Sequence, residues 1–217
     1  TPAPPTFIPS PSRMRGHVAL PVAHPRGDHR RLILLHVADG QPNEPVRLEH
    51  VRRQAEHFEI RRVESLDLHA GAARADDGSG RTPALLKTHL LMLALSHAAD
   101  LEAERLIVPA QVDGEFDRMA VVSEQAQLIE HLAGLEATDL PSIELPFIDL
   151  SDQQLVELGA QMDVPWHLAW TCTVHRDRAC GACPACRRRH RAFESAGLLD
   201  PAAHGSATPA SPGKTPA

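Results

Sequence analysis

Short apolar runs alternate along this chain with longer stretches whose apolar residues recur every three or four positions. Such runs are typical of strands, and such stretches are typical of amphipathic helices. The pattern predicts strands at 17–22, 31–37, 60–68, 104–110 and 142–148, and helices at 45–58, 82–102, 123–135, 151–162 and 187–201. The 82–102 helix is apolar almost all round, which predicts burial. The 151–162 helix begins at Ser151 and carries Gln154 three residues later, the signature of a capping box.

Strands that alternate with helices indicate a parallel sheet covered on both faces. We therefore expect an α/β, doubly wound, mostly parallel sheet, in which residues 31–37, 104–110 and 142–148 form neighbouring strands. Ligands in such sheets bind outside the carboxyl ends of the strands. This rule predicts a ligand crevice near the loops after residues 37 and 110.

Composition suggests how the chain is divided. Residues 1–16 are rich in proline and residues 202–217 are low in complexity, so both are expected to be disordered. Between them we expect an α/β domain at 17–165 and a cysteine-rich segment with a terminal helix at 166–201. No stretch approaches the roughly 20 apolar residues of a membrane span, and residues 1–17 lack the apolar core of a secretory signal. These features predict a cytoplasmic protein without membrane contact. The net charge of −6 argues against general nucleic-acid binding.

All four cysteines fall within residues 172–186, as Cys172, Cys180, Cys183 and Cys186. Four thiolates suit tetrahedral Zn²⁺, and such a closed site is structural because it leaves no coordination position for substrate. A reducing compartment disfavours disulfides. An iron–sulfur cluster also uses four cysteines and stays open as an alternative. His175 or His190 could replace one thiol, although four thiols already complete the site.

The cysteines are followed by a basic run, Arg187 to Arg191, at the start of the last predicted helix. These side chains could hold phosphate or RNA. The simpler interpretation is a solvated helix face whose charge offsets a zinc tetrathiolate, and we favour it.

The stretch from Trp170 to Pro201 resembles the C-terminal signature of the 7-cyano-7-deazaguanine synthase family of the queuosine pathway. That signature is Thr-Trp-Ser-Cys, then Cys-Gly-x-Cys-x-x-Cys, then Arg, Ala-Phe, Gly and Asp-Pro. The matching residues are Trp170, Cys172, Cys180, Gly181, Cys183, Cys186, Arg188 or Arg189, Ala192, Phe193, Gly197, Asp200 and Pro201, with Thr171 in place of the serine. A weaker resemblance extends back to residue 17 and includes Gly40, Gln41 and Glu44 as the family's Gly-Gln turn and the helix after it.

This resemblance implies an ATP-dependent ligase with a pyrophosphatase loop and a structural zinc. Its members adenylate 7-carboxy-7-deazaguanine and convert the carboxylate to a nitrile with ammonia. ATP and Mg²⁺ are thus expected as cofactors, and a deazapurine as the small-molecule substrate, only if this activity is retained. A homo-oligomer is compatible with the sequence.

The family's phosphate-binding loop, Ser-Gly-Gly-x-Asp-Ser, follows its first strand, yet the expected strand at 17–22 is followed here by AHPRGDHRR. The family's Tyr-Pro-Asp-Cys is replaced within EFDRMAVV (115–122), and its Arg-Asn within ALLKT (84–88). A second glycine-containing stretch, at 75–83, is acidic and is expected to be an ordinary loop. The sequence thus predicts a family member degenerate in ATP binding. The alternative is a non-catalytic, zinc-stabilised binding or partner protein derived from that family.

No catalytic or cofactor-binding residue is assigned by the sequence. The acids Asp113, Glu115 and Asp117 follow the 104–110 strand, where loop acids are usually only solvated. The histidines His17, His24 and His29 lie near the lost loop and could bind anions weakly.

Overall fold

The computed structural model describes residues 5–9, 14–23, 31–38, 43–67, 85–112, 115–174 and 178–202. The strands are β1 (Thr6–Pro9), β2 (Leu32–Ala38), β3 (Arg62–Asp67), β4 (Arg105–Ile107) and β5 (Ser142–Glu144). The helices are α1 (Met14–Ala23), α2 (Glu44–His57), α3 (Leu86–Asp100), α4 (Phe116–Ala133), α5 (Asp152–Gln161) and α6 (Pro184–Ser195).

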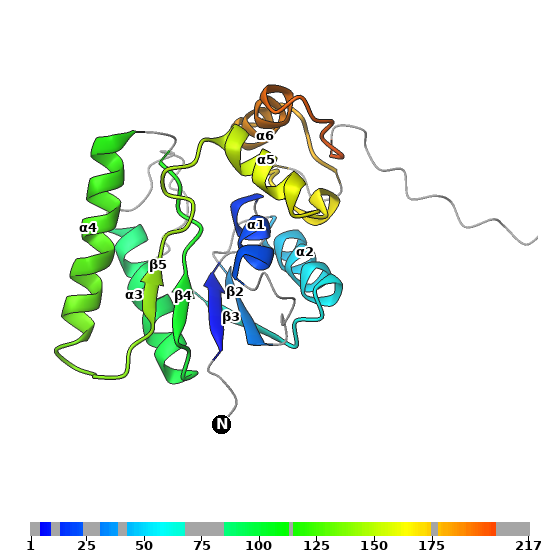
Figure 1. Ribbon diagram of the computed structural model, residues 1–217. Coiled ribbons are helices and arrows are strands. Elements are labelled where there is room, and N and C mark those ends of the chain that lie inside the picture. Colours follow the sequence, from blue (N-terminus) through cyan, green and yellow to red (C-terminus); the bar gives the residue numbers. More distant parts are fainter. Residues whose placement is uncertain are drawn as a thin grey trace, which may run out of the picture.

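The strands form one parallel five-stranded sheet in the order β3-β2-β1-β4-β5 (Figure 1). This confirms the predicted α/β class. In the central strand, Phe7 pairs with Ile33 on one side and with Leu106 on the other. The strand order reverses direction between β1 and β4, so the topological switch point lies there.

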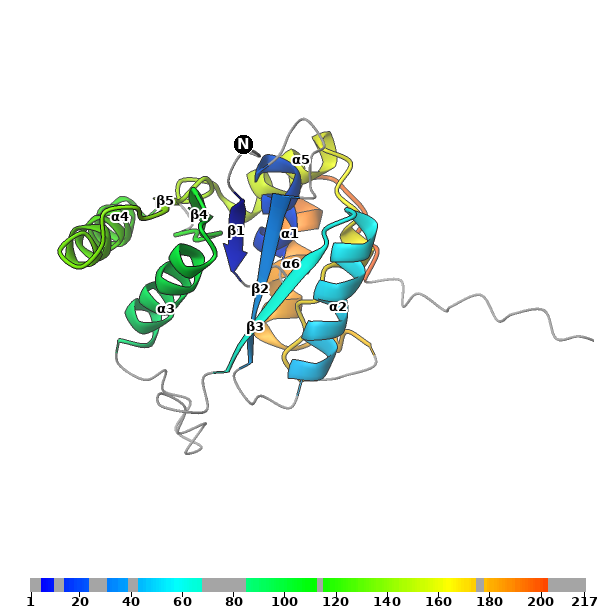
Figure 2. The same cartoon turned by 90° about the horizontal axis from the view of Figure 1, so that it is seen from below.

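Helices cover both faces of the sheet (Figure 2). Successive side chains of a strand point to opposite faces, and in β1 Ile8 joins the core beneath α1 and α2, while Phe7 joins the core beneath α3 and α4. Trp166 and Phe193, from the cysteine-rich part of the chain, belong to the same core as Ile8. That segment is therefore packed onto the sheet domain through shared apolar burial.

Two expectations about the N-terminal region are wrong. Residues 17–22 are not a strand but part of α1, where Val18 and Leu20 are fully buried. A buried helix and a buried strand both read as a continuous apolar run, and periodicity alone does not separate them. Within the expected disordered leader 1–16, residues 6–9 form the central strand β1. That strand is only four residues long and is surrounded by prolines, so its pattern is too short to detect.

Three other features differ from the expected ones: the strand order, the burial of α3 and the start of α4. Strands β4 and β5 are neighbours as predicted, but β1 lies between β2 and β4. Helix α3 buries only Ala94, Leu95 and Ala98, so the predicted burial all round is wrong. Helix α4 begins seven residues earlier than expected. The stretch at 75–83 and residues 203–217 lie outside the described residues.

The capping box at the start of α5 is confirmed. The Gln154 backbone N–H donates to Ser151 Oγ at 3.2 Å, and the Ser151 N–H donates to Gln154 Oε1 at 2.8 Å. Two backbone donors that the helix leaves unpaired are thereby satisfied.

Among the described helices, none combines the length and the apolar character that a membrane crossing requires.

Candidate functional site

A cavity of about 320 Å³ lies at the carboxyl ends of the central strands. Pro9 at the end of β1, Val37 near the end of β2 and Val108 after β4 contribute to its wall. Residues of α1, α3 and α4, the loop 109–112 and Leu145 after β5 complete the lining. The predicted crevice after residues 37 and 110 is therefore confirmed as a cavity beside the topological switch point.

The charged groups that line this cavity are all cationic. They are Arg15 from α1, Lys87 from α3 and Arg118 from α4, and no acidic side chain belongs to the described lining. Arg118 Nη1 donates to Glu115 Oε2 at 3.2 Å in an exposed pair. Most of the remaining lining is apolar. A cavity of this composition suits a ligand with an apolar body and a negatively charged group.

Two of the three acids expected near this edge, Glu115 and Asp117, do not line the cavity. Glu115 and Asp117 are exposed, and Asp113 lies outside the described residues. His17 is fully buried in α1, where its Nε2 donates to the Pro165 carbonyl at 3.0 Å, so the expected anion-binding role is wrong. His24, His29 and the glycine at 27 lie outside the described residues, as do Gly40 and Gln41.

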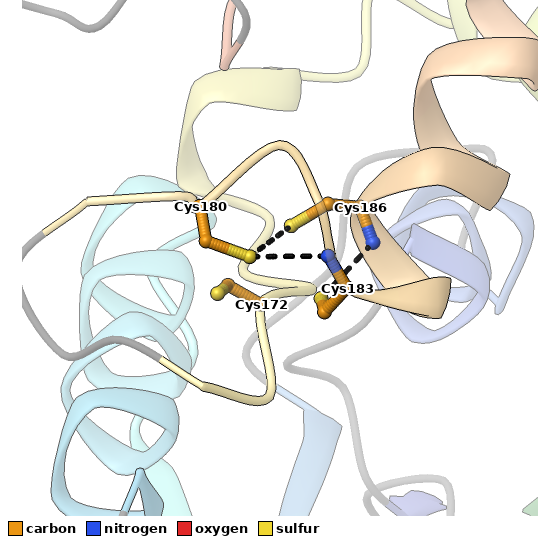
Figure 3. A group of neighbouring side chains, drawn as sticks. All are labelled: Cys172, Cys180, Cys183 and Cys186. Carbon is orange, nitrogen blue, oxygen red and sulfur yellow. Dashed lines mark hydrogen bonds between the residues drawn. The ribbon is translucent and has the colours of Figure 1, made fainter.

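The second site is the cysteine cluster, in which the Sγ atoms of Cys172, Cys180, Cys183 and Cys186 lie within 4.8 Å of one another (Figure 3). Cys172 lies outside the helices and strands, whereas Cys183 caps α6 and Cys186 lies in its first turn. The Cys183 N–H donates to Cys180 Sγ at 3.2 Å, and the Cys186 N–H donates to Cys183 Sγ at 3.4 Å. The sequence prediction that these four thiols gather at one point agrees with this geometry.

The thiols of Cys183 and Cys186 differ in acidity because they share hydrogen bonds. Burial raises the pKa of Cys183, but hydrogen bonds from the backbone N–H groups of Thr173 and Cys186 outweigh this and lower it overall. Burial raises the pKa of Cys186, and its hydrogen bond to Cys183 raises it further. The cluster thus holds one thiol poised to ionise, which is the form that binds a metal.

The turn before Cys172 is held by side chains from three helices. His17 of α1 donates to Pro165 O, and Arg189 of α6 donates to Trp166 O at 2.9 Å and to Ala169 O at 2.6 Å. From α2, His50 Nδ1 and Gln54 Nε2 donate to Leu168 O at 2.8 and 3.1 Å. The Pro165 and Trp166 carbonyls also accept from the backbone N–H groups of Leu168 and Ala169, so the side chains of His17 and Arg189 add a second hydrogen bond there.

Further contacts tie the cluster to α2. Asn43, which precedes the helix and is buried, donates from Nδ2 to the Cys172 carbonyl at 2.9 Å. The rings of His50 and Trp170 lie 5.0 Å apart and are inclined by 31°. The position of Cys172 is therefore set by a residue 129 positions earlier in the chain.

The basic run 187–191 does not form one surface. Arg189 points inward and is only 2 % exposed, while Arg188 binds Asp152 of α5. Arg187, His190 and Arg191 remain exposed. His190 borders a second cavity, of about 400 Å³, beside Cys180 and Cys186, but it does not belong to the thiol cluster. His175 lies outside the described residues.

Sequence reasoning missed the cations of the cavity and Asn43. Arg15 lay in the supposed leader, and Lys87 was noted only as part of a lost motif. Lys87 and Arg118 each lie in the first turn of a helix that follows a strand, α3 after β3 and α4 after β4, and this position is a signal in the sequence. Only the fold shows that the two side chains line the same cavity.

A sequence model of the family described as queuosine biosynthesis protein QueC matches residues 86–197, just over half of the chain. The 7-cyano-7-deazaguanine synthase of Chlorobaculum parvum is 29 % identical over 208 residues, which cover 85 % of this chain and 89 % of that protein.

Two solved structures share the fold. NMN synthetase from Francisella tularensis superposes with a TM-score of 0.52 and 16 % identity, over 91 % of this chain and 89 % of that one. The U34-tRNA thiolase NcsA from Methanococcus maripaludis, solved with its [4Fe-4S] cluster, gives a TM-score of 0.51 and 11 % identity, over 87 % and 63 %. At these identities the likeness concerns the fold alone. From the matched stretch and the cysteine geometry together, the chain belongs to the queuosine biosynthesis protein QueC family.

Proposed function

We propose that this chain is a 7-cyano-7-deazaguanine synthase-like protein of the queuosine pathway that retains the deazapurine site but is degenerate in ATP binding. The cavity at the carboxyl strand ends is the proposed binding site. A flat deazapurine suits its apolar walls, and the carboxylate of 7-carboxy-7-deazaguanine suits Lys87 and Arg118 at its edge. The proposed compartment is the cytosol, where free thiols stay reduced.

The loss of ATP binding is inferred from the connection between β1 and α1. Because the first strand is β1, the connection that corresponds to the family's phosphate loop is residues 10–13 and not the stretch after residue 22. Residues 10–13 lie outside the described part of the chain, and their sequence is Ser-Pro-Ser-Arg. A phosphate cradle needs several backbone N–H groups that converge on one point, which glycines allow. Pro11 has no N–H to give, and no glycine is present. This missing glycine pair is the observation that carries the proposal.

We also propose zinc at the cysteine cluster. A tetrahedral ion bound to four thiolates at about 2.3 Å keeps the sulfurs about 3.8 Å apart. Cys180 Sγ and Cys186 Sγ are 3.9 Å apart, and all four sulfurs lie within 4.8 Å of one another. An iron–sulfur cluster places its thiolates on different iron atoms, and hence farther apart. The close spacing therefore favours a single ion. Such an ion, when bound, holds the segment in place and takes no part in substrate chemistry.

The proposal is tested by two measurements on the purified chain. Isothermal titration should show binding of 7-carboxy-7-deazaguanine, while ATP with Mg²⁺ should bind weakly or not at all. A chromatographic assay for AMP in the presence of ATP, ammonia and 7-carboxy-7-deazaguanine should show negligible release, because an adenylating enzyme must align the α-phosphate with the carboxylate. Steady AMP release would overturn the proposed degeneracy and establish the full family activity.

Variants of the cavity test the ligand site separately. Lys87→Gln and Arg118→Gln should each weaken binding of the carboxylate about tenfold, since a hydrogen bond to a charged group contributes about 1.5 kcal/mol. Arg52→Gln, on the exposed surface of α2, serves as the matched control and should leave affinity unchanged. Equal affinity of all these variants would place the deazapurine elsewhere.

A further inference from the structure

Gln111 lines the cavity at the carboxyl strand ends with a side chain whose hydrogen-bonding capacity is only partly used. Its Nε2 donates to the Leu150 carbonyl at 2.7 Å. Its Oε1 is buried and accepts no hydrogen bond from any described residue. A buried amide oxygen without a donor destabilises the fold unless another molecule supplies one. Because Gln111 belongs to the cavity wall, a bound ligand can supply that donor.

The orientation of this amide is fixed by its surroundings. A carbonyl oxygen only accepts hydrogen bonds, so the amide must turn its nitrogen, and not its oxygen, towards Leu150 O. The loop that carries Gln111 is itself held, since the Val112 N–H donates to the Ile148 carbonyl at 3.3 Å. Rotation of the amide would break the bond to Leu150 and set two oxygens against each other. Oε1 of Gln111 is therefore fixed as an acceptor.

Gln111 and the cations of the cavity belong to different sides of the sheet. Leu150, to which Gln111 is bonded, packs against the core beneath α1 and α2. Lys87 and Arg118 lie in the first turns of α3 and α4, which cover the other face (Figure 2). A ligand that spans the cavity with its negative group at the cations therefore presents its opposite end to Gln111.

We propose that Gln111 recognises the donor edge of the deazapurine and thereby selects ligands that carry a 2-amino group. In 7-carboxy-7-deazaguanine the carboxylate is attached to the five-membered ring. The ring N–H and the 2-amino group lie on the six-membered ring, at the other end of the molecule. An amide oxygen has two lone pairs and accepts from this edge. The inference rests on the deazapurine site proposed above and adds the residue that distinguishes ligands within it.

The first test compares two ligands that differ only in the proposed donor. Isothermal titration of the full chain should show about tenfold weaker binding of the analogue that lacks the 2-amino group than of 7-carboxy-7-deazaguanine. Equal affinities would overturn the inference and leave the deazapurine site in place, with water as the donor to Oε1. Absence of binding by both ligands would instead overturn the deazapurine site itself, on which the inference rests.

The variant Gln111→Met assigns the selectivity to this side chain. Methionine has nearly the same length, so it fills the space but removes the amide oxygen. The variant should bind both ligands with the same affinity, because only the ligand with the amino group loses a partner. A purely structural role of Gln111 would weaken both ligands equally and keep their ratio, which would overturn the inference. Gln161→Met, at an exposed position of α5, is the matched control and should keep the wild-type ratio. The wild-type comparison decides the question by itself if Gln111→Met does not fold.

Discussion

Arg189 and Asp200 form a buried ion pair that closes the C-terminal segment onto the core. Arg189 Nε lies 2.9 and 3.0 Å from the two carboxylate oxygens, and the two residues are 2 % and 8 % exposed. The other guanidinium nitrogens donate to the Ala169 and Trp166 carbonyls. A buried guanidinium is tolerated because each of its donor groups finds an acceptor. This single side chain therefore joins α6, the last described residues and the turn that leads to Cys172.

Removal of one partner from this pair should be costly. Asp200→Ala leaves a buried positive charge, and we expect the free energy of unfolding to fall by about 3 kcal/mol. Asp139→Ala, at an exposed site, should change it by less than about 0.5 kcal/mol. Urea unfolding followed by circular dichroism measures both. Equal effects of the two substitutions would mean that the ion pair contributes nothing beyond a surface contact.

Gly159 is required by the approach of Trp166 to α5. A Cβ built on Gly159 would lie 2.2 Å from Trp166 Cζ2. Alanine favours helices over glycine by about 1 kcal/mol, but overpacking of a core costs about 1–3 kcal/mol. Because the Trp166 ring is buried in the core, we expect Gly159→Ala to lower the melting temperature. Gln161→Ala, on the exposed side of the same helix, should leave it unchanged; a more stable Gly159→Ala protein would contradict the packing described.

The buried His17 should make stability depend on pH. Burial lowers the pKa of His17 from 6.5 to about 4, against the opposing effect of its hydrogen bonds. The unfolded chain therefore binds more protons than the folded one between these pH values, so stability is present above pH 6.5 and is lost as the pH falls towards 4. Protonation of His17 should lower the free energy of unfolding by about 3 kcal/mol over this pH range.

Urea unfolding at several pH values measures this dependence. Acid also acts on the thiolates, so the informative quantity is the difference between wild type and His17→Gln, in which the side-chain amide can still donate to Pro165 O. That difference should shrink as the pH falls. His89→Gln, an exposed histidine on α3, should keep the wild-type dependence. A His17→Gln protein with the full acid sensitivity of wild type would assign the titration to other groups.

Metal content tests the cysteine cluster. We expect close to one zinc per chain by elemental analysis, and its loss in Cys183→Ser. Hydrogen exchange should then rise first in residues 165–200, because metal binding by the four thiols contributes to the folding free energy of that segment. Ala182→Ser, one residue away and exposed, should retain the metal. Iron with a visible charge-transfer band, or no metal in the wild-type protein, would refute the zinc proposal.

The sequence by itself determined those features that are encoded locally. The type of most elements follows from apolar spacing, as in α2 and α5, and the capping box of Ser151 and Gln154 needs only residues three positions apart. The cysteine cluster is of the same kind, because short spacings bring Cys180, Cys183 and Cys186 together in one turn and the start of one helix. The local pattern failed where it was ambiguous, as in the buried α1, and where it was too short, as in β1.

Only the tertiary structure decided which distant residues meet. The cavity collects Arg15, Lys87 and Arg118 from three helices because parallel strands all end at one edge of the sheet. The sequence predicts that Arg189 is solvated like the other basic residues of its run. In the structure its position on α6 directs the side chain into the core, where it binds Asp200. A periodic pattern specifies which side of an element is apolar, but not which other element covers that side. That choice depends on the packing of the whole chain, and it separates a buried, paired arginine from its exposed neighbours.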